Sequence, residues 1–343
     1  MFEKKLKGRT IALIGGAGFI GHNLALALKR YGADPHVIDG LQVNNLGAFT
    51  NSGEDSNKTL YVNFIFERMR LLREVGIPLH VLDARDYHAL SRCLGEIKAD
   101  CFVQLAAIAH ANRSNKDPYS TFDHSFRTLE NALDTARDQN VHFVYFSSSM
   151  VYGNFEGEAA VEERHCEPMG IYGALKYGGE KLVIAHNQVF NTPYTIVRPS
   201  ALYGERCVSR RVGQAFIENA LRGMRLTVNG DGNDALDFTY IGDLVQGILR
   251  SIALPEARNQ TFNLTYGSAR TLNQMIELVK QAFPDIEVVH NPRDGLMPER
   301  GTLSVDKAKR LIGYQPQYPL EKGFPRYIDW YKQLSAEHPD YFN

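Results

Sequence analysis

Cysteine is scarce in this sequence, and its placement excludes two classes of protein. The chain of 343 residues has four cysteines, none in a Cys-x-x-Cys pair and none beside a cluster of histidines. That spacing fits neither a zinc site nor the disulfide framework of a small secreted domain. We therefore expect no metal, and the scattered thiols favour a reducing, cytoplasmic location.

The sequence also lacks an excess of charge and a long hydrophobic run. Lys and Arg number 38 against 39 Asp and Glu, so charge gives no reason to expect nucleic acid or an anionic membrane as a partner. The apolar run after the basic start MFEKKLKGRT is interrupted by glycines and has no cleavage site. We expect neither a signal peptide nor a membrane span.

Short apolar segments alternate with helix-like stretches in the first part of the chain. The apolar segments are TIALIGG, DPHVID, LHVLDA, CFVQLAA, HFVYFSSS and YTIVRPS, and helices are expected near 20–31, 86–97, 121–139 and 172–190. This alternation predicts parallel β-α-β units and an α/β fold with a Rossmann-type doubly wound parallel sheet.

The pattern becomes mixed after about residue 198, and a chain of this length and 44% hydrophobic content is large enough for two lobes. We predict a dinucleotide-binding sheet domain over 1–197, completed by parts of about 236–263. A smaller, mixed α/β lobe that binds the substrate is predicted mainly over 198–343.

A glycine-rich turn joins the first expected strand to the first expected helix. Gly15, Gly18 and Gly21 are spaced G-x-x-G-x-x-G, with Phe19 and Ile20 at the start of the helix. Glycines allow the sharp turn, let a pyrophosphate approach the helix N-terminus and let the helix pack closely on the strand. A plain tight turn would also use glycine, but the strand before and the helix after it favour a dinucleotide site.

An acidic residue, Asp39, ends the next strand in HVIDG. Its carboxylate can accept hydrogen bonds from the hydroxyls of an adenosine ribose. None of the dozen residues after it is Lys or Arg, which a 2′-phosphate would need. The predicted cofactor is therefore NAD and not NADP.

Two further strand ends supply candidates for cofactor binding. Asp83 and Ala84 follow the third strand, and Asp83 is a candidate for the adenine edge or, alternatively, the N-cap of the next helix. Leu105, Ala106 and Ala107 follow the fourth strand. Small side chains there would let the cofactor pass, or would fill an ordinary core.

The spacing Tyr-x-x-x-Lys occurs twice in IYGALKYGGEK, as Tyr172/Lys176 and Tyr177/Lys181. A helix turns by about 100° per residue, so the two tyrosines point about 140° apart and only one pair can serve a given site. A third occurrence, in YPLEK, indicates that chance produces this spacing. The strand end VYFSSSMVYG brings hydroxyls to the carboxyl edge of the sheet, just before the helix that starts near Tyr172.

Together these motifs resemble the extended short-chain dehydrogenases/reductases, in particular their nucleotide-sugar epimerase/dehydratase group. The segments that carry the resemblance are GGAGFIG, VID, LAA, SSSMVYG, YGALK, RPSALYG, GDGNDALDFTYIGDL and FNLTYGSARTLNQM. The resemblance implies that Ser148, Tyr172 and Lys176 are catalytic. It leaves Tyr177 and Lys181 on the other helix face, in packing or at the surface.

A tyrosine with an ordinary pKa near 10 is a poor base at neutral pH. A lysine ammonium one helical turn away and the positive nicotinamide favour the phenolate of Tyr172, which can take a proton from a sugar hydroxyl as hydride passes to NAD. Lys176 is also expected to hold the nicotinamide ribose, so this pair binds cofactor as well. Ser148 is expected to hydrogen-bond the same sugar oxygen, or alternatively to cap the loop.

Members of this family oxidise the sugar, usually at C4, and then diverge. Dehydratases place Asp-Glu after the catalytic hydroxyl residue and decarboxylases commonly place an acid there, whereas this chain has Ser149 and Met150. We therefore favour an NAD-dependent nucleotide-sugar 4-epimerase, working through a transient 4-keto sugar, over a C4 dehydrogenase. The intact set of Ser148, Tyr172 and Lys176 argues against a non-catalytic NAD sensor or scaffold.

The expected substrate lobe departs from the family's pattern. Leu236, Ala201 and Ser125 stand where the family usually has Arg, Asn and Asn, so other cations must meet a substrate diphosphate. The candidates for substrate binding are Ser149, Arg206, Arg210, Arg211 and Arg300. These departures leave the nucleotide open between UDP and GDP, and the sugar open, heptoses included.

Two helices bear on assembly. Those expected over 121–139 and 172–190 resemble the pair that forms a four-helix dimer interface in this family, which predicts a homodimer; packing on the sheet is the alternative.

Residues 50–78 look like an exposed loop and an amphipathic helix inserted between two strands. Two roles stay open for this insertion, a cover over the cofactor or part of an interface. The family's usual context is cell-surface polysaccharide assembly.

Overall fold

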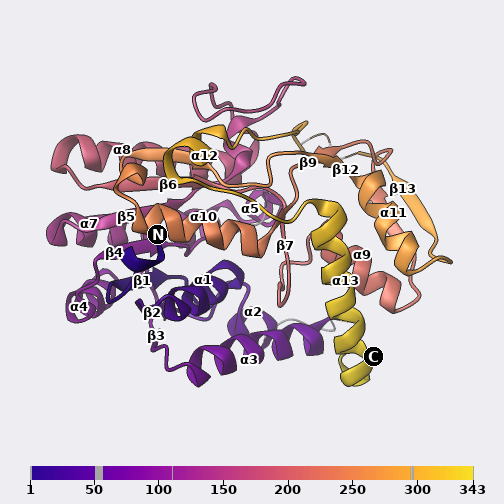
Figure 1. The fold of residues 1–343 in the computed structure, drawn as a ribbon, viewed down its shortest axis with the longest axis horizontal. Coiled ribbons are helices and arrows are strands. Elements are labelled where there is room, and N and C mark those ends of the chain that lie inside the picture. The colour runs from indigo at the N-terminus through magenta and orange to yellow at the C-terminus, as the bar shows by residue number, and fades with distance from the viewer. Residues whose placement is uncertain (1, 51–56, 110, 294, 296, 343) are drawn as a thin grey trace.

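A seven-stranded parallel sheet organises one side of the molecule (left in Figure 1), in a computed structural model that describes residues 2–50, 57–109, 111–293, 295 and 297–342. The strands follow the order β11-β6-β5-β4-β1-β2-β3. Their bounds are β1 Thr10–Ile14, β2 Asp34–Asp39, β3 Leu79–Val81, β4 Cys101–Gln104, β5 His142–Phe146, β6 Tyr194–Arg198 and β11 Gln260–Asn263. The order reverses between β1 and β4, which leaves a crevice for a ligand at their carboxyl ends. The predicted fold class is confirmed.

Helices cover both faces of this sheet, so its central strands are almost entirely buried and mostly apolar. The helices α1 (Phe19–Arg30) and α10 (Ile241–Ala253) pack on one face, and α4 (Tyr87–Ile97), α7 (Thr128–Gln139) and α8 (Gly170–Phe190) pack on the other. Ahead of α7 the chain runs through α6 (Pro118–Phe122) and a π-helical turn, η2 (Asp123–Arg127). The four helices expected from the sequence therefore form, with ends within a few residues of their predicted bounds.

The remaining elements build a mixed region beside the sheet. Three small sheets pair β7 (Leu202–Tyr203) with β10 (Thr239–Tyr240), β9 (Ala235–Leu236) with β12 (Arg270–Thr271), and β8 (Leu226–Asn229) with β13 (Val288–Asn291). The helices there are α9 (Val212–Leu221), α11 (Leu272–Ala282), α12 (Asp306–Ile312) and α13 (Leu320–Glu337). Short helices elsewhere are η1 (Glu3–Lys5), α5 (Ala111–Lys116), η3 (Ser149–Tyr152), η4 (Pro255–Ala257) and η5 (Pro339–Phe342). The division into two domains stays a prediction.

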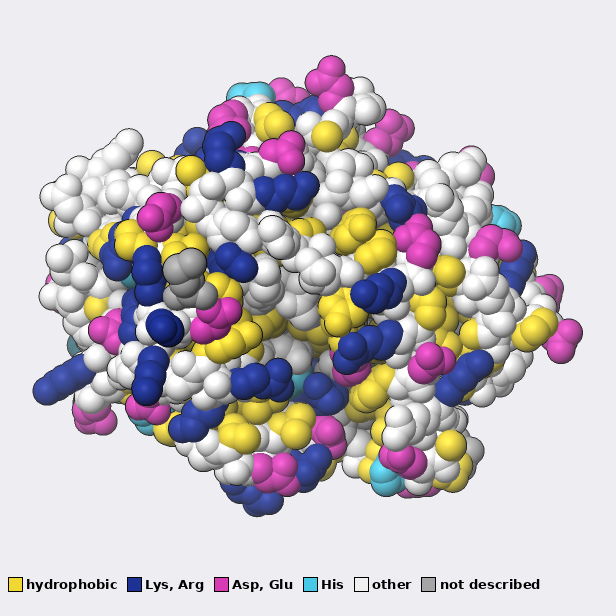
Figure 2. Space-filling model, viewed as in Figure 1, with side chains coloured by type: hydrophobic (Ala, Val, Ile, Leu, Met, Phe, Trp, Pro, Cys, Tyr) yellow, Lys and Arg dark blue, Asp and Glu magenta, His cyan; other side chains and the backbone are white. Residues whose placement is uncertain are grey.

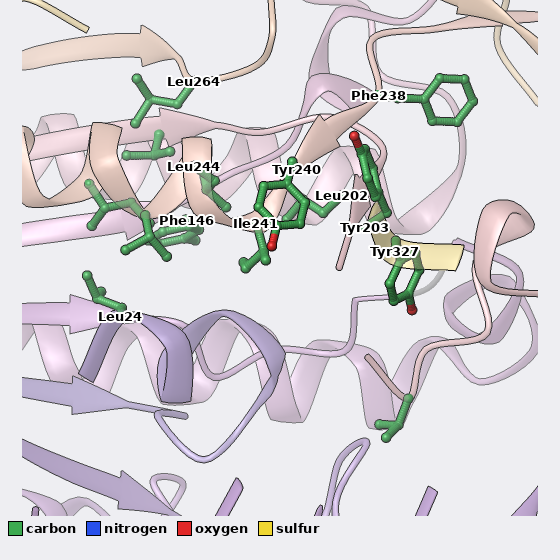
Figure 3. Close-up of a cluster of buried hydrophobic side chains, with 14 of the residues drawn as sticks. Leu24, Phe146, Leu202, Tyr203, Phe238, Tyr240, Ile241, Leu244, Leu264 and Tyr327 are labelled. Atoms are coloured by element: carbon green, nitrogen blue, oxygen red, sulfur yellow. The ribbon is translucent and has the colours of Figure 1, made fainter. Parts of the chain in front are cut away.

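One hydrophobic core runs through both regions (Figure 3). Leu24 of α1 and Phe146 of β5 belong to the same cluster of buried side chains as Tyr203 of β7 and Tyr327 of α13. The sheet and the mixed region therefore bury apolar surface against each other, and burial of such surface is the main favourable contribution to folding.

The inserted segment forms α2 (Leu46–Thr50) and α3 (Lys58–Glu74), while residues 51–56 lie outside the described part of the chain. In Figure 1, α3 runs along the lower edge of the molecule toward the end of α13. Tyr61 donates a hydrogen bond of 2.7 Å to the buried Glu218 of α9, and the rings of Phe64 and Trp330 lie 5.3 Å apart. The insertion thus joins the sheet region to the C-terminal helix.

None of the helices in the described part of the chain combines the length and the apolar character needed to cross a membrane.

Candidate active site

The glycine turn lies where β1 ends and α1 begins. Gly15 has a φ of +81°, and a Cβ there would stand 2.5 Å from the backbone nitrogen of Ala106. A Cβ at Gly21 would stand 2.4 Å from the carbonyl oxygen of Gly16. Both positions need glycine because the backbone segments approach too closely for a side chain. At Gly18, the N-cap of α1, a Cβ would meet nothing closer than 3.4 Å, so the open side of the turn faces free space.

A cavity of about 160 Å³ opens beside this turn. Its lining includes every residue between positions 15 and 107 that the sequence nominates for cofactor binding: Gly15, Gly18, Phe19, Ile20, Gly21, Asp39, Asp83, Ala84, Leu105, Ala106 and Ala107. We call it the turn cavity. Backbone N–H groups at a helix N-terminus, small side chains and a carboxylate are the groups that a dinucleotide needs, so these residues fit NAD.

Asp39 is fixed by the backbone around it. Its carboxylate accepts hydrogen bonds from the backbone nitrogens of Ala17 (2.9 Å) and Leu41 (2.8 Å). Burial raises the pKa of this carboxyl, and the two backbone bonds oppose that rise. A carboxylate has about four acceptor positions, so two remain for the hydroxyls of a ribose.

Asp83 pairs with Arg85 at 2.6 Å and accepts a hydrogen bond from Gln42. The bonds with Arg85 hold the pKa of Asp83 at about 2, so it is ionised at neutral pH. The N-cap of α4 is Asp86, whose carboxylate accepts from the backbone nitrogen of Ala89 at 3.0 Å. The alternative that Asp83 caps this helix is therefore wrong.

A second cavity of about 460 Å³ lies between the carboxyl edge of the sheet and the mixed region, and Ile20, Leu105, Ala107 and Arg211 line both cavities. We call it the large cavity. Its wall includes Ser148, Tyr172 and Lys176, together with Ser147 and Ser149. The structure thus brings the three predicted catalytic residues together on the wall of the large cavity, which shares other lining residues with the turn cavity.

Two short segments position the reacting hydroxyls. Ser148 is the N-cap of η3, where its Oγ accepts from the backbone nitrogen of Met150 at 3.2 Å, and α8 starts two residues before Tyr172. Burial raises the pKa of Tyr172, whereas the positive charge of Arg211 and the bond with Ser148 lower it. Ser148 therefore both caps the turn, as the alternative expected, and reaches the tyrosine.

Lys176 is buried, and its Nζ donates a hydrogen bond of 2.6 Å to the carbonyl oxygen of Phe146 at the end of β5. Burial lowers the pKa of this lysine to about 8, against the opposing effect of Glu180. The ammonium and the neutral amine are thus both accessible near neutral pH, while the bond to Phe146 holds Nζ at the strand end.

The neighbouring serines have different surroundings. Ser147 donates to Glu180, which in turn forms a buried ion pair with Arg198 at 2.6 Å. The backbone nitrogen of Ser149 donates to the carbonyl oxygen of Pro199 at 2.9 Å. The Ser147 hydroxyl is therefore bonded to the carboxylate of this ion pair.

The second tyrosine–lysine pair faces elsewhere. Tyr177 packs against the buried cluster that contains Val151 and Phe155, and Nζ of Lys181 lies 4.7 Å from the centre of the Tyr177 ring. Neither residue lines the turn cavity or the large cavity. Tyr177 thus packs and Lys181 is exposed, which agrees with the expectation of a packing or surface role for this pair.

The predicted substrate arginines separate into two groups. Arg210, Arg211 and Arg300 line the large cavity, and burial lowers the pKa of Arg300 to about 10. Arg206 lines neither cavity, because its Nε bonds His22 at 3.2 Å and its guanidinium lies 3.8 Å from the Glu67 carboxylate. The structure thus does not bring Arg206 to the predicted substrate site. Its φ of +63° turns the chain there and sends the side chain toward α1 and α3.

One basic residue of the large cavity was missed. Arg293 follows β13 and bonds Asp234, the only acid that the described lining residues include, at 3.1 Å. A basic residue two positions after a strand end is the local signal that could have indicated it. Figure 2 shows Lys and Arg side chains around the middle of the face presented in Figure 1. With four arginines and one acid, the large cavity suits an anion such as a diphosphate.

Comparisons with known proteins agree with this geometry. A putative UDP-glucose 4-epimerase from Methanocaldococcus jannaschii is 26% identical over 332 residues, which cover 94% of this chain and 98% of the relative. UDP-glucuronate 4-epimerase 4 of Arabidopsis thaliana is 26% identical over 345 residues, which cover 94% of this chain and 75% of the relative.

A solved structure of UDP-glucuronic acid 4-epimerase from Bacillus cereus, in complex with UDP-glucuronic acid and NAD, has a TM-score of 0.83 at 23% identity and covers 95% of this chain and 99% of its own. That likeness supports the fold. The model of the family described as NAD dependent epimerase/dehydratase matches residues 11–265. This confirms both the resemblance seen in the sequence and NAD as the cofactor. Because the match covers well over half of its length, the chain belongs to the NAD dependent epimerase/dehydratase family.

Proposed function

We propose that this chain is a nucleotide-sugar 4-epimerase that works through a transient 4-keto sugar. The observation that carries the proposal is that Ser148, Tyr172 and Lys176 line the large, arginine-lined cavity, whose wall shares Ile20, Leu105, Ala107 and Arg211 with the turn cavity. A sugar in the large cavity would there lie next to a nicotinamide held from the turn cavity. The names of the relatives, UDP-glucose and UDP-glucuronate 4-epimerases, support the same reaction.

The chain's own groups suit the proton transfers of this reaction. Bound NAD supplies a hydride acceptor and, in its reduced form, a hydride donor. Tyr172 takes the proton of the sugar's C4 hydroxyl and returns it after the sugar has turned, while the Ser148 hydroxyl hydrogen-bonds the same sugar oxygen and positions it. The cationic form of Lys176 favours the phenolate. Epimerisation then needs only that the keto sugar present its opposite face.

The residues after Ser148 favour this reaction over elimination. Ser149 and Met150 line the large cavity beside Ser148, at the positions where a dehydratase would carry its acids. Neither side chain exchanges protons at neutral pH, so the site offers no second acid or base there. Dehydration and decarboxylation are therefore not proposed.

The proposed substrate is a nucleoside diphosphate sugar, with its diphosphate bound by Arg210, Arg211, Arg293 and Arg300. Uridine is the nucleotide that the relatives' names favour. A homodimer and a cytoplasmic location stay predictions from the sequence.

The test is proton NMR of the purified protein with a panel of UDP-, GDP-, CDP- and dTDP-sugars, following the sugar C4 proton and the nicotinamide signals together. Conversion to the C4 epimer without net change of cofactor would support the proposal and name the nucleotide. Accumulation of reduced cofactor with a 4-keto sugar would show a C4 dehydrogenase instead.

A further inference from the structure

A buried arginine from the insertion reaches the turn cavity. Arg68 lies on α3, is 1% exposed, and lines this cavity together with Gly18 and Phe19 of the glycine turn. Its Nε and Nη2 donate to the carbonyl oxygen of Arg206. Its Nη1 has no hydrogen-bond partner among the described residues. One side of the guanidinium is thus fixed and the other is free.

The positive charge of Arg68 is not balanced by a bonded carboxylate. No ion pair joins it to an acid in the described part of the chain, and Glu67, the residue before it on α3, pairs with Arg70 at 3.4 Å and Arg206 at 3.8 Å. Asp39 acts on Arg68 only at longer range, and both of its oxygens already accept backbone bonds. Burying an unpaired cation costs several kcal/mol, on the order of what an anionic ligand in contact would restore.

The location of Arg68 identifies the anion. Arg68 bonds the carbonyl of Arg206, whose Nε bonds His22 in the first turn of α1. Arg68 therefore lies near this turn, in the lining that it shares with Gly18 and Phe19. That turn carries no Lys, Arg, Asp or Glu. The helix dipole supplies only about half a positive charge against a pyrophosphate. Arg211, the other cation that lines the turn cavity, bonds Ala109 and acts on Tyr172, so it belongs to the catalytic end.

We propose that Arg68, supplied by the inserted helix α3, binds the cofactor's pyrophosphate at the N-terminus of α1. The bond from Arg68 to the Arg206 carbonyl orients the guanidinium so that Nη1 is available to the phosphate oxygens. The insertion between β2 and β3 would then add a cation that the glycine turn lacks. This inference rests on NAD as the cofactor and does not depend on the reaction proposed above.

The test measures binding and not turnover. Full-length native protein and Arg68→Met, freed of bound nucleotide, are titrated by calorimetry with NAD, ADP, adenosine and 2′-AMP. A charge-assisted bond to phosphate predicts that the variant's Kd rises by about 10- to 100-fold for NAD and ADP, with little change for adenosine and 2′-AMP. Arg70→Met is the matched control: Arg70 lies on the same helix, half exposed and paired with Glu74 at 2.6 Å. It should bind all four ligands like the native chain.

The outcomes separate the possible roles of Arg68. An equal loss for ADP and adenosine would overturn the proposal, because it would mean that Arg68 only holds the chain in shape. A loss confined to 2′-AMP would overturn it in favour of a 2′-phosphate site, and no loss would overturn it outright. If Arg68→Met does not fold, Arg68→Gln can still donate to the Arg206 carbonyl without the charge, and the same selective loss is expected.

Discussion

The helix α8 carries two tyrosine–lysine pairs with the same spacing and different surroundings. Tyr172 and Lys176 meet a strand end, a serine hydroxyl and a cavity, whereas Tyr177 and Lys181 meet an apolar cluster and each other. The helix gives both pairs the same reach, so the spacing is not what separates them. The groups opposite each face decide which tyrosine exchanges protons and which one packs.

The most direct test of the difference between the two tyrosines removes each phenol oxygen in turn. Tyr172→Phe should lower kcat by about 10³-fold, because the group that takes the sugar proton is lost. NAD should stay bound, which is measured as nucleotide released on denaturation. Tyr177→Phe should leave kcat nearly unchanged. If Tyr177→Phe is instead the inactive variant, the assignment of the two helix faces is wrong.

A second substitution tests the hydroxyl of Ser148, which lies opposite the pair Tyr172/Lys176 and not opposite Tyr177/Lys181. Ser148→Ala should lower kcat by about 10²-fold with a smaller effect on KM, because Ser148 is expected to act on the reacting oxygen. The bond with Ser148 lowers the pKa of Tyr172, so its removal raises that pKa. The rising limb of kcat against pH should therefore move to higher pH. A profile that does not move would show that the serine does not act on the tyrosine.

The two lysines should differ in how pH affects stability. Burial lowers the pKa of Lys176 to about 8, below the value near 10.4 of an unfolded chain, so between these values the unfolded chain binds more protons. The free energy of unfolding of the native chain should thus rise with pH in this window, by about 1 to 3 kcal/mol relative to Lys176→Met. Urea unfolding at several pH values measures this difference. Lys181→Met should follow the native curve.

The smallest effect concerns packing. Tyr177→Ala should lower the free energy of unfolding by about 1 to 2 kcal/mol, because the ring leaves the cluster with Val151 and Phe155. The kcat of the folded fraction should be unchanged. Urea unfolding and activity corrected for folded protein check both parts. A loss of turnover in the folded fraction would contradict the separation of the two faces.

The parts that the sequence predicted depend on neighbours close in the chain. The glycine turn, Asp39 and the strand ends at Asp83 and Leu105 are each read from a strand, the helix after it and the residue between them. Parallel pairing then brings these ends to one edge, and the turn cavity is lined as expected.

The parts that were wrong or missed depend on distant segments. The Arg206 side chain points away from the large cavity because of its backbone angle and because it bonds His22 and pairs with Glu67. Arg293 reaches the large cavity only because β13 pairs with β8, far from it in sequence. Arg68 reaches the turn cavity because α3 packs on α1, while Phe64 of α3 contacts Trp330 of α13. No pattern of neighbouring residues predicts these contacts between segments that lie far apart in the sequence.

The link between α3 and α13 also has a consequence for the order in which the protein is made. Tyr61 of α3 and Tyr331 of α13 both donate to the same buried Glu218 carboxylate. On the ribosome, α3 emerges long before α13, and its apolar face must wait for that partner. Until α13 is made, the nascent chain therefore exposes this apolar face of α3, and exposed apolar surface of that kind promotes aggregation.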